Sequence, residues 1–124
     1  MEGVRSVREV MGLAITEVNL FPSAWGTAPG PGAAQDFGAE LARTAGLSQS
    51  DMIAALETSF DYMAGVVRDM DSENRMADAR YFDGSQMEVH AHIAMALADM
   101  HEHLGQLIQY ARTNHVVPSW SMGN

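Results

Sequence analysis

Apolar residues recur every three or four positions in three long segments, and this helical spacing is the feature that most limits what the chain can fold into. The predicted helices cover residues 6–24, 49–70 and 85–113. Ser6 followed by Glu9 has the pattern of a capping box, which marks the start of the first helix. No segment shows the alternation of a strand, so the sequence predicts an all-α, up-and-down helical bundle.

Two segments between these helices lose the helical spacing. Residues 25–38 are rich in Gly, Pro and Ala and are predicted to form a long connection, followed by a short helix over residues 39–46. Residues 71–84 are charged and are predicted to form a second loop. Three long helices are fewer than the usual four around such a core, so either the bundle is thin or a partner chain completes it.

Composition excludes several kinds of function. With 124 residues, the chain is long enough for one domain, spanning residues 1–124. Its formal net charge of −9 disfavours nucleic acid and anionic membrane surfaces as partners. The absence of cysteine excludes disulfides and thiol nucleophiles, and the absence of lysine excludes a Schiff base and a P-loop lysine. No apolar run spans a bilayer and the start lacks a signal-peptide segment, so we expect a soluble, cytoplasmic protein.

The third predicted helix carries four of the five histidines: His90, His92, His101 and His103. The apolar stripe predicted to face the core consists of Val89, Ile93, Leu97, Met100, Leu104, Leu107 and Ala111. The two histidines of each H-x-H pair lie about 200° apart around the helix, so neither pair can chelate one ion. His92 and His103 share an edge of the stripe, but roughly 16 Å separates them along the helix axis.

Asp99 and His103 lie one helical turn apart and are the best candidates for metal ligands, because their oxygen and nitrogen atoms could meet one divalent cation. Glu88 and His92 form a second pair of this kind. Two ligands are too few for a firm site, and the inward acidic side chain that could supply a third is Glu17. The alternative is that Asp99 and His103 form only a hydrogen-bonded pair at the edge of the core.

Two stretches of the sequence resemble the DinB/YfiT-like family. Residues 101–121, HEHLGQLIQYARTNHVVPSWS, are similar to its C-terminal signature, and residues 2–26, EGVRSVREVMGLAITEVNLFPSAWG, are similar to its second helix. The resemblance implies a four-helix bundle, typically dimeric, in which three histidines bind a divalent metal such as zinc or nickel. It also implies a metal-dependent enzyme, since characterised relatives include thiol transferases that depend on mycothiol or bacillithiol.

Carried over residue by residue, two of the family's metal ligands fall on Asp99 and His103, and the aspartate still permits coordination. The ligand on the family's second helix falls on about Leu13, which cannot bind a metal. The family's first helix would precede residues 2–26, so the bundle is expected to lack one helix and to expose an apolar face. We therefore expect an obligate homodimer, with helices either packed together or exchanged between the chains.

Two interpretations of function remain open. In the first, the chain is a divalent-metal-dependent hydrolase or thiol transferase, with Asp99, His103 and Glu17 as ligands to zinc or nickel. In the second, the site is degenerate and binds no metal, and the chain is a non-catalytic dimeric scaffold or a module that binds small apolar ligands. Acidic or histidine side chains around Leu13 would indicate a rebuilt site. Aromatic residues that could line a pocket, or simply pack, are Trp25, Phe37, Tyr110 and Trp120.

Overall fold

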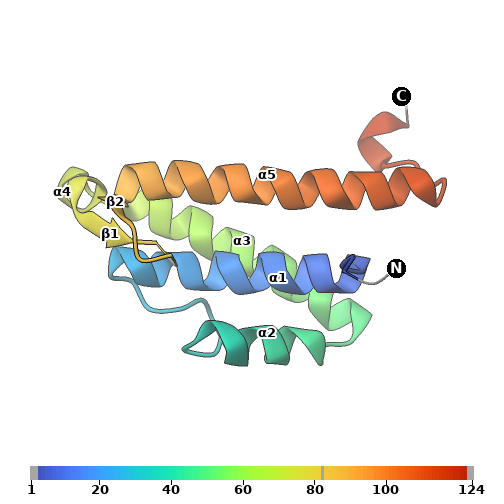
Figure 1. The fold of residues 1–124 in the computed structure, drawn as a ribbon, viewed down its shortest axis with the longest axis horizontal. Helices are drawn as coiled ribbons and strands as arrows, with labels where there is room; N and C mark the ends of the chain where they lie inside the picture. Colours follow the sequence, from blue (N-terminus) through green and yellow to red (C-terminus); the bar gives the residue numbers. More distant parts are fainter. Residues whose placement is uncertain (1–2, 82, 123–124) are drawn as a thin grey trace.

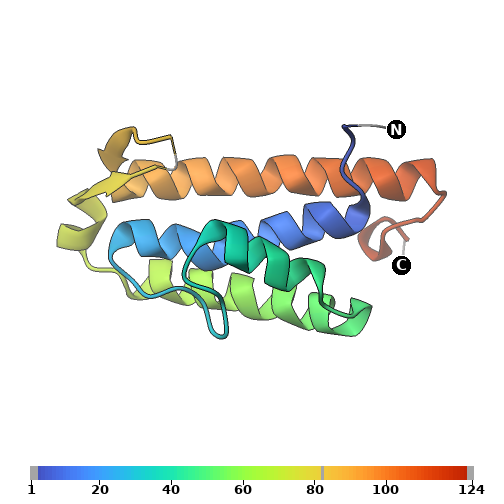
Figure 2. The same cartoon turned by 60° about the horizontal axis from the view of Figure 1, so that its bottom comes forward.

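Helix α1 (Val7–Leu20) is the central element of the computed structural model, which describes residues 3–81 and 83–122 (Figure 1). The other elements are η1 (Phe21–Trp25, a 3-10 helix), α2 (Phe37–Ala45), α3 (Gln49–Asp69), α4 (Ser72–Met76), β1 (Asp78–Arg80), β2 (Gln86–Glu88), α5 (Val89–Thr113) and η2 (Ser119–Ser121, also 3-10). Helices α2, α3 and α5 all pack against α1. In Figure 1, α5 lies above α1 and α2 lies below it, and in Figure 2 α2 passes in front of α1. The predicted all-α helical bundle is therefore confirmed.

Local sequence signals set the helix starts. The Ser6 side chain accepts a hydrogen bond from the Glu9 backbone, and the Glu9 carboxylate accepts one from the Ser6 backbone at 2.6 Å, as the capping-box pattern predicts. Ser48 caps α3 by accepting from the backbone N–H of Asp51. These contacts satisfy donors at helix starts that have no partner within the helix.

The core lies around α1 because helices cover it on several sides. Val10, Ile15, Val18 and Phe21 are almost completely buried. The main hydrophobic cluster joins residues of α1, η1, β1 and α5, namely Ala14, Val18, Phe21, Trp25, Ala79, Val89, Ala96 and Met100. Burial of this apolar surface is the main term that holds α5 against α1.

A buried carboxylate attaches α2 to α1. Glu40 on α2 is fully buried and accepts hydrogen bonds from the Asn19 side chain at 2.9 Å, from the Ala34 backbone at 2.8 Å and from Arg43 at 2.6 and 2.7 Å. The connection before α2 passes close to Asn19, since a Cβ atom at Gly30 would lie 2.1 Å from the Asn19 Oδ1 atom. Glycine is therefore required at this point of the predicted loop.

The prediction that the chain contains no strand is wrong at one place. β1 and β2 form an antiparallel two-stranded sheet in which Asp78 pairs with Glu88 and Arg80 with Gln86. Gly84 has a φ of 86° in the turn between them. The last helix consequently begins at Val89 rather than at residue 85. Strands of three residues are too short to show an alternating pattern in the sequence.

The predicted apolar stripe of α5 is also wrong in part. The buried residues of α5 are Val89, His92, Ala96, Met100 and His103. Leu97 and Leu104 are 57% and 45% exposed, because α3 and α5 each pack along α1 and hardly contact one another. Across the gap on α3, Ile53 and Phe60 are 47% and 42% exposed. We call the surface formed by Ile53, Phe60, Leu97 and Leu104 the α3/α5 face.

Within the described residues, no helix is both long and apolar enough to cross a membrane.

Candidate metal centre

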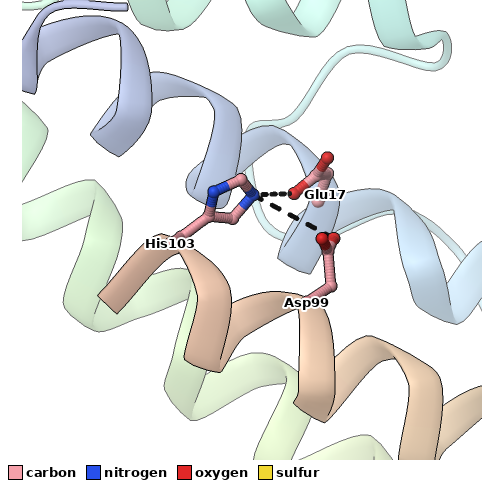
Figure 3. A group of neighbouring side chains, drawn as sticks. All are labelled: Glu17, Asp99 and His103. Carbon is pink, nitrogen blue, oxygen red and sulfur yellow. Dashed lines mark hydrogen bonds and ion pairs between the residues drawn. The ribbon is translucent and has the colours of Figure 1, made fainter. Parts of the chain in front are cut away.

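Three potential ligands converge where α1 and α5 pack together (Figure 3). The His103 Nε2 atom lies 2.7 Å from a Glu17 carboxylate oxygen and 4.0 Å from an Asp99 carboxylate oxygen. One ligand atom from each residue lies within 4.8 Å of the other two. The structure thus brings together the three residues that the sequence analysis named, Glu17, Asp99 and His103.

The helices fix the positions of these side chains. Asp99 and His103 are one turn apart on α5 and therefore project from the same face of the helix. Glu17 projects from the last part of α1 toward that face (Figure 3). The side chains of Glu17, Asp99 and His103 are 13%, 27% and 7% exposed, so the cluster is shielded but still open to solvent at its Asp99 edge.

The electrostatics of the cluster favour an additional positive charge. Burial raises the pKa of Glu17 to about 7, the hydrogen bond with His103 opposes this rise, and the negative charge of Asp99 adds to it. Two carboxylates held this close in a shielded position repel one another when both are ionised. A divalent cation between them would remove that repulsion, and carboxylate oxygens with one imidazole are a donor set that zinc and related metals accept.

One feature of His103 limits how tightly a metal would bind. Its Nδ1 atom is buried and has no hydrogen-bond partner among the described residues. A histidine that binds a metal through Nε2 usually donates its other N–H to a carboxylate or carbonyl group, and loss of such a partner typically costs about 10–100-fold in affinity. The three donors therefore fit a divalent cation, with packing rather than a hydrogen bond to orient the imidazole.

His92 is a core residue and the second predicted ligand pair does not form. Its Nδ1 atom accepts a hydrogen bond from the Trp25 indole at 3.0 Å, and the rings of Phe21, Trp25 and Tyr81 pack edgewise around it. Burial lowers the pKa of His92, which favours the neutral form that can accept this hydrogen bond at Nδ1. The Glu88 carboxylate lies 3.3 Å from the exposed His90 side chain instead. The prediction that Glu88 and His92 form a ligand pair one helical turn apart is wrong, because Glu88 belongs to β2 rather than to the helix.

The predicted aromatic pocket does not form as one site. Trp25 lies in the core, the Tyr110 hydroxyl donates to the Arg5 backbone carbonyl, and Trp120 is 73% exposed near the end of the chain. Phe37 instead lines a groove of about 640 Å³ between α1 and α2. Leu13 and Glu17 line the same groove, so a carboxylate lies one turn from the position where the family resemblance places a ligand. The sequence analysis missed this groove because nothing in the pattern shows how α2 lies on α1.

The fold and the cluster define a class of protein, a helical bundle with an acidic, histidine-containing candidate metal centre between two helices. A scan against protein-family models and searches of curated proteins and of solved structures found no match to this chain.

Proposed function

We propose that Glu17, Asp99 and His103 bind one divalent transition metal, zinc or nickel, and that this centre carries the activity of the protein. The observation that supports the proposal is the convergence of one imidazole nitrogen and two carboxylates, from two helices, within 4.8 Å. Three protein ligands leave at least one coordination position open, which is the arrangement of catalytic rather than structural zinc sites.

The resemblance to DinB-like proteins supports the same class of activity, metal-dependent hydrolysis or thiol transfer. A metal bound here would supply Lewis acidity and lower the pKa of a bound water or thiol. The residues of the chain would hold the ion at a site that α1 and α5 largely shield from solvent, with the Asp99 edge as the more open side. Shielding strengthens the electrostatic effect of the ion on a bound substrate.

The test is metal binding by matched histidine variants. Purified protein is stripped with a chelator, and zinc and nickel binding are measured by calorimetry and by elemental analysis after dialysis. We expect one ion per chain in the wild type and in His101→Ala, whose exposed side chain forms a hydrogen bond with the Leu97 carbonyl and is not part of the cluster. Asp99→Asn, Glu17→Gln and His103→Gln should each weaken binding by at least about tenfold, because even the loss of a residue that only orients a ligand typically costs about 10–100-fold.

Circular dichroism of every variant shows whether lost binding reflects lost fold. Glu17→Gln is the most informative substitution, since it keeps the shape of the side chain and removes the charge that repels Asp99. A wild-type protein that binds neither ion, or a His101→Ala variant that loses as much affinity as His103→Gln, would contradict the proposal. In either case, the cluster would be a hydrogen-bonded pair without a metal, as the alternative interpretation held, except that His103 is paired with Glu17 at 2.7 Å rather than with Asp99.

A second proposal concerns the partner. We propose that the α3/α5 face packs against the same face of a second copy, so that the protein is a homodimer. A pocket of about 280 Å³ lies in this face, with Phe60, Leu97 and Leu104 among its lining residues and no acidic side chain. In a chain with a net charge of −9, an uncharged face is where two copies can approach with least repulsion.

The size of the face is also adequate. Helices α3 and α5 have 21 and 25 residues, which correspond to roughly 31 and 37 Å of length. A stable interface buries roughly 800 Å² per partner, and two helices of this length provide an extended surface for such a contact. Because one face packs on an identical face, a two-fold axis closes the assembly at two chains. The proposed dimer is also compatible with the second interpretation of function, a non-catalytic dimeric scaffold, since dimerisation does not depend on the metal.

A further inference from the structure

The groove between α1 and α2 begins near the start of α1 and ends beside Glu17 of the candidate metal centre. Arg5 and Arg8 line it at the first end, and Leu13 and Glu17 line it further along the helix. Arg8 and Glu17 are nine residues apart, which corresponds to roughly 14 Å along the helix axis. Its volume of about 640 Å³ lies within the range of small-molecule sites in proteins.

Contacts between the two helices fix their register along the groove. The Asn19 side chain is hydrogen-bonded to Glu40, and a Cβ atom at Gly12 would lie 3.1 Å from the Thr44 hydroxyl oxygen. Later residues of α2 therefore face earlier residues of α1, and the helices are antiparallel. Phe37, the first residue of α2, consequently lies toward the Glu17 end of the groove.

The middle and the Glu17 end of the groove have apolar walls. Leu13 lines it from α1, and Phe37 and Leu41 line it from α2. Phe37 and Leu41 are one turn apart on α2 and remain 36% and 37% exposed. Leu13 is 7% exposed, so the exposed apolar surface of the groove comes mainly from the α2 wall. This surface favours an apolar ligand, because its burial stabilises the complex.

The opposite end of the groove carries positive charge in a strongly acidic protein. Arg5 and Arg8 are two of only seven basic residues, against sixteen acidic ones. One Arg8 nitrogen donates to the Leu47 carbonyl at 2.6 Å, which holds the guanidinium in place and leaves its other N–H groups for a ligand. Glu9 also lines this end, but its carboxylate accepts hydrogen bonds from the Ser6 backbone and hydroxyl groups.

We propose that this groove binds an amphipathic anion, with its apolar chain against Leu13, Phe37 and Leu41 and its acidic headgroup on Arg5 and Arg8. The far end of the chain then lies beside Glu17. One part of this inference rests on the proposed function, namely that the far end of the chain is the end of a substrate that reacts at the metal centre. Binding of the anion itself rests on the groove and the two arginines and needs no metal.

The experiment uses chelator-treated, metal-free protein and three probes of equal chain length: decanoate, decanol and decyltrimethylammonium. Binding is measured by calorimetry below the concentration at which each probe forms micelles. We expect decanoate to bind at least about tenfold more tightly than decanol, because a hydrogen bond between a guanidinium and a carboxylate is roughly twice as strong as one between neutral groups. The cation should bind most weakly.

Variants separate the two ends of the groove. Arg5→Gln with Arg8→Gln should abolish the preference for decanoate over decanol, whereas Arg68→Gln, at an exposed position on α3, should leave it unchanged. Ala42→Trp, at an exposed position that lines the groove, should weaken all three probes by filling the space. Circular dichroism confirms that each variant is folded.

Three results would overturn the inference: equal binding of decanoate and decanol, decanoate binding that survives Ala42→Trp, or a change in sedimentation on Ala42→Trp alone, which would show that a second copy occupies the groove. Decanoate binding in a protein that fails to bind zinc or nickel would instead refute only the metal centre. The two proposals therefore fail separately.

Discussion

Truncation of Glu40 should loosen the attachment of α2 to α1. Glu40 is fully buried and accepts four hydrogen bonds, of which two come from the Arg43 guanidinium. Glu40→Ala leaves the Asn19 amide and the Ala34 backbone N–H without their acceptor and leaves Arg43 without its counter-charge. Removal of one partner from a buried ion pair costs about 3–5 kcal/mol, and we expect about 3 kcal/mol because the Arg43 side chain is 33% exposed.

This loss is a large share of the roughly 5–15 kcal/mol by which a domain is usually stable. Urea unfolding followed by far-UV circular dichroism measures it directly. With a denaturant slope of about 1.5 kcal/mol/M, the midpoint should fall by about 2 M. Glu57→Gln, at an exposed position on α3, is the matched control and should change the midpoint little.

The pH dependence of a further variant, Glu40→Gln, gives an independent check. Burial alone would raise the pKa of Glu40, but hydrogen bonds from Arg43, Ala34 and Asn19 outweigh it and hold the pKa below its usual value. A carboxyl with a lowered pKa contributes stability that is present above the unfolded pKa of about 4.3 and is lost as the pH falls through the lower folded value. The stability difference between the wild type and Glu40→Gln should therefore shrink below about pH 4.

A Glu40→Ala variant that remains folded with less than about 1 kcal/mol of lost stability would refute this reasoning. It would mean that the stranded groups find water or other partners at little cost. A pH-independent difference between the wild type and Glu40→Gln would contradict the assigned role of the charge, even if the total loss were large.

Two further predictions concern α5. If the α3/α5 face forms a dimer, the wild type should sediment as two chains at micromolar concentration and Leu97→Glu should sediment as one chain. The control Thr58→Glu, at an exposed position on α3, should remain a dimer. A folded wild-type monomer would refute the interface. Because burial lowers the pKa of His92, the unfolded chain takes up a proton at this residue before the fold does, so the fold should lose stability as the pH falls below about 6.5. In urea unfolding at several pH values, the free energy of unfolding of His92→Gln should fall less steeply with decreasing pH. The same pH dependence in both proteins would mean that His92 stays solvated.

The sequence predicted features of the fold that depend on neighbours in the chain. Ser6 and Glu9 cap α1 as expected, because their contact spans one helical turn. Asp99 and His103 meet for the same reason, and Glu17 joins them because it faces inward from α1. The burial of Glu40, by contrast, could not be predicted from the sequence, since it depends on contacts with Asn19 and Ala34 that only the tertiary arrangement creates.

The error in the apolar stripe of α5 has a different cause. Leucine at positions 97 and 104 indicates an apolar face of the helix, but a sequence does not show whether a neighbour covers that face. In a single chain, α1 covers only the side of α5 that carries His92, Ala96 and His103. The mismatch between the apolar pattern and the observed burial is the reason why the α3/α5 face was proposed as the dimer interface.

Helix α1 links the two proposals physically. Glu17 lies both in the candidate metal centre and at the end of the groove, so a ligand in the groove and an ion at the centre would meet at one carboxylate. The groove wall formed by α2 is held by Asn19 and Glu40, half a turn further along α1. The position of Phe37 at the Glu17 end of the groove thus depends on a buried hydrogen-bond network that contributes no ligand to the candidate centre. Under both proposals, substitutions on α2 would change the ligand that the groove accepts and leave Glu17, Asp99 and His103 in place.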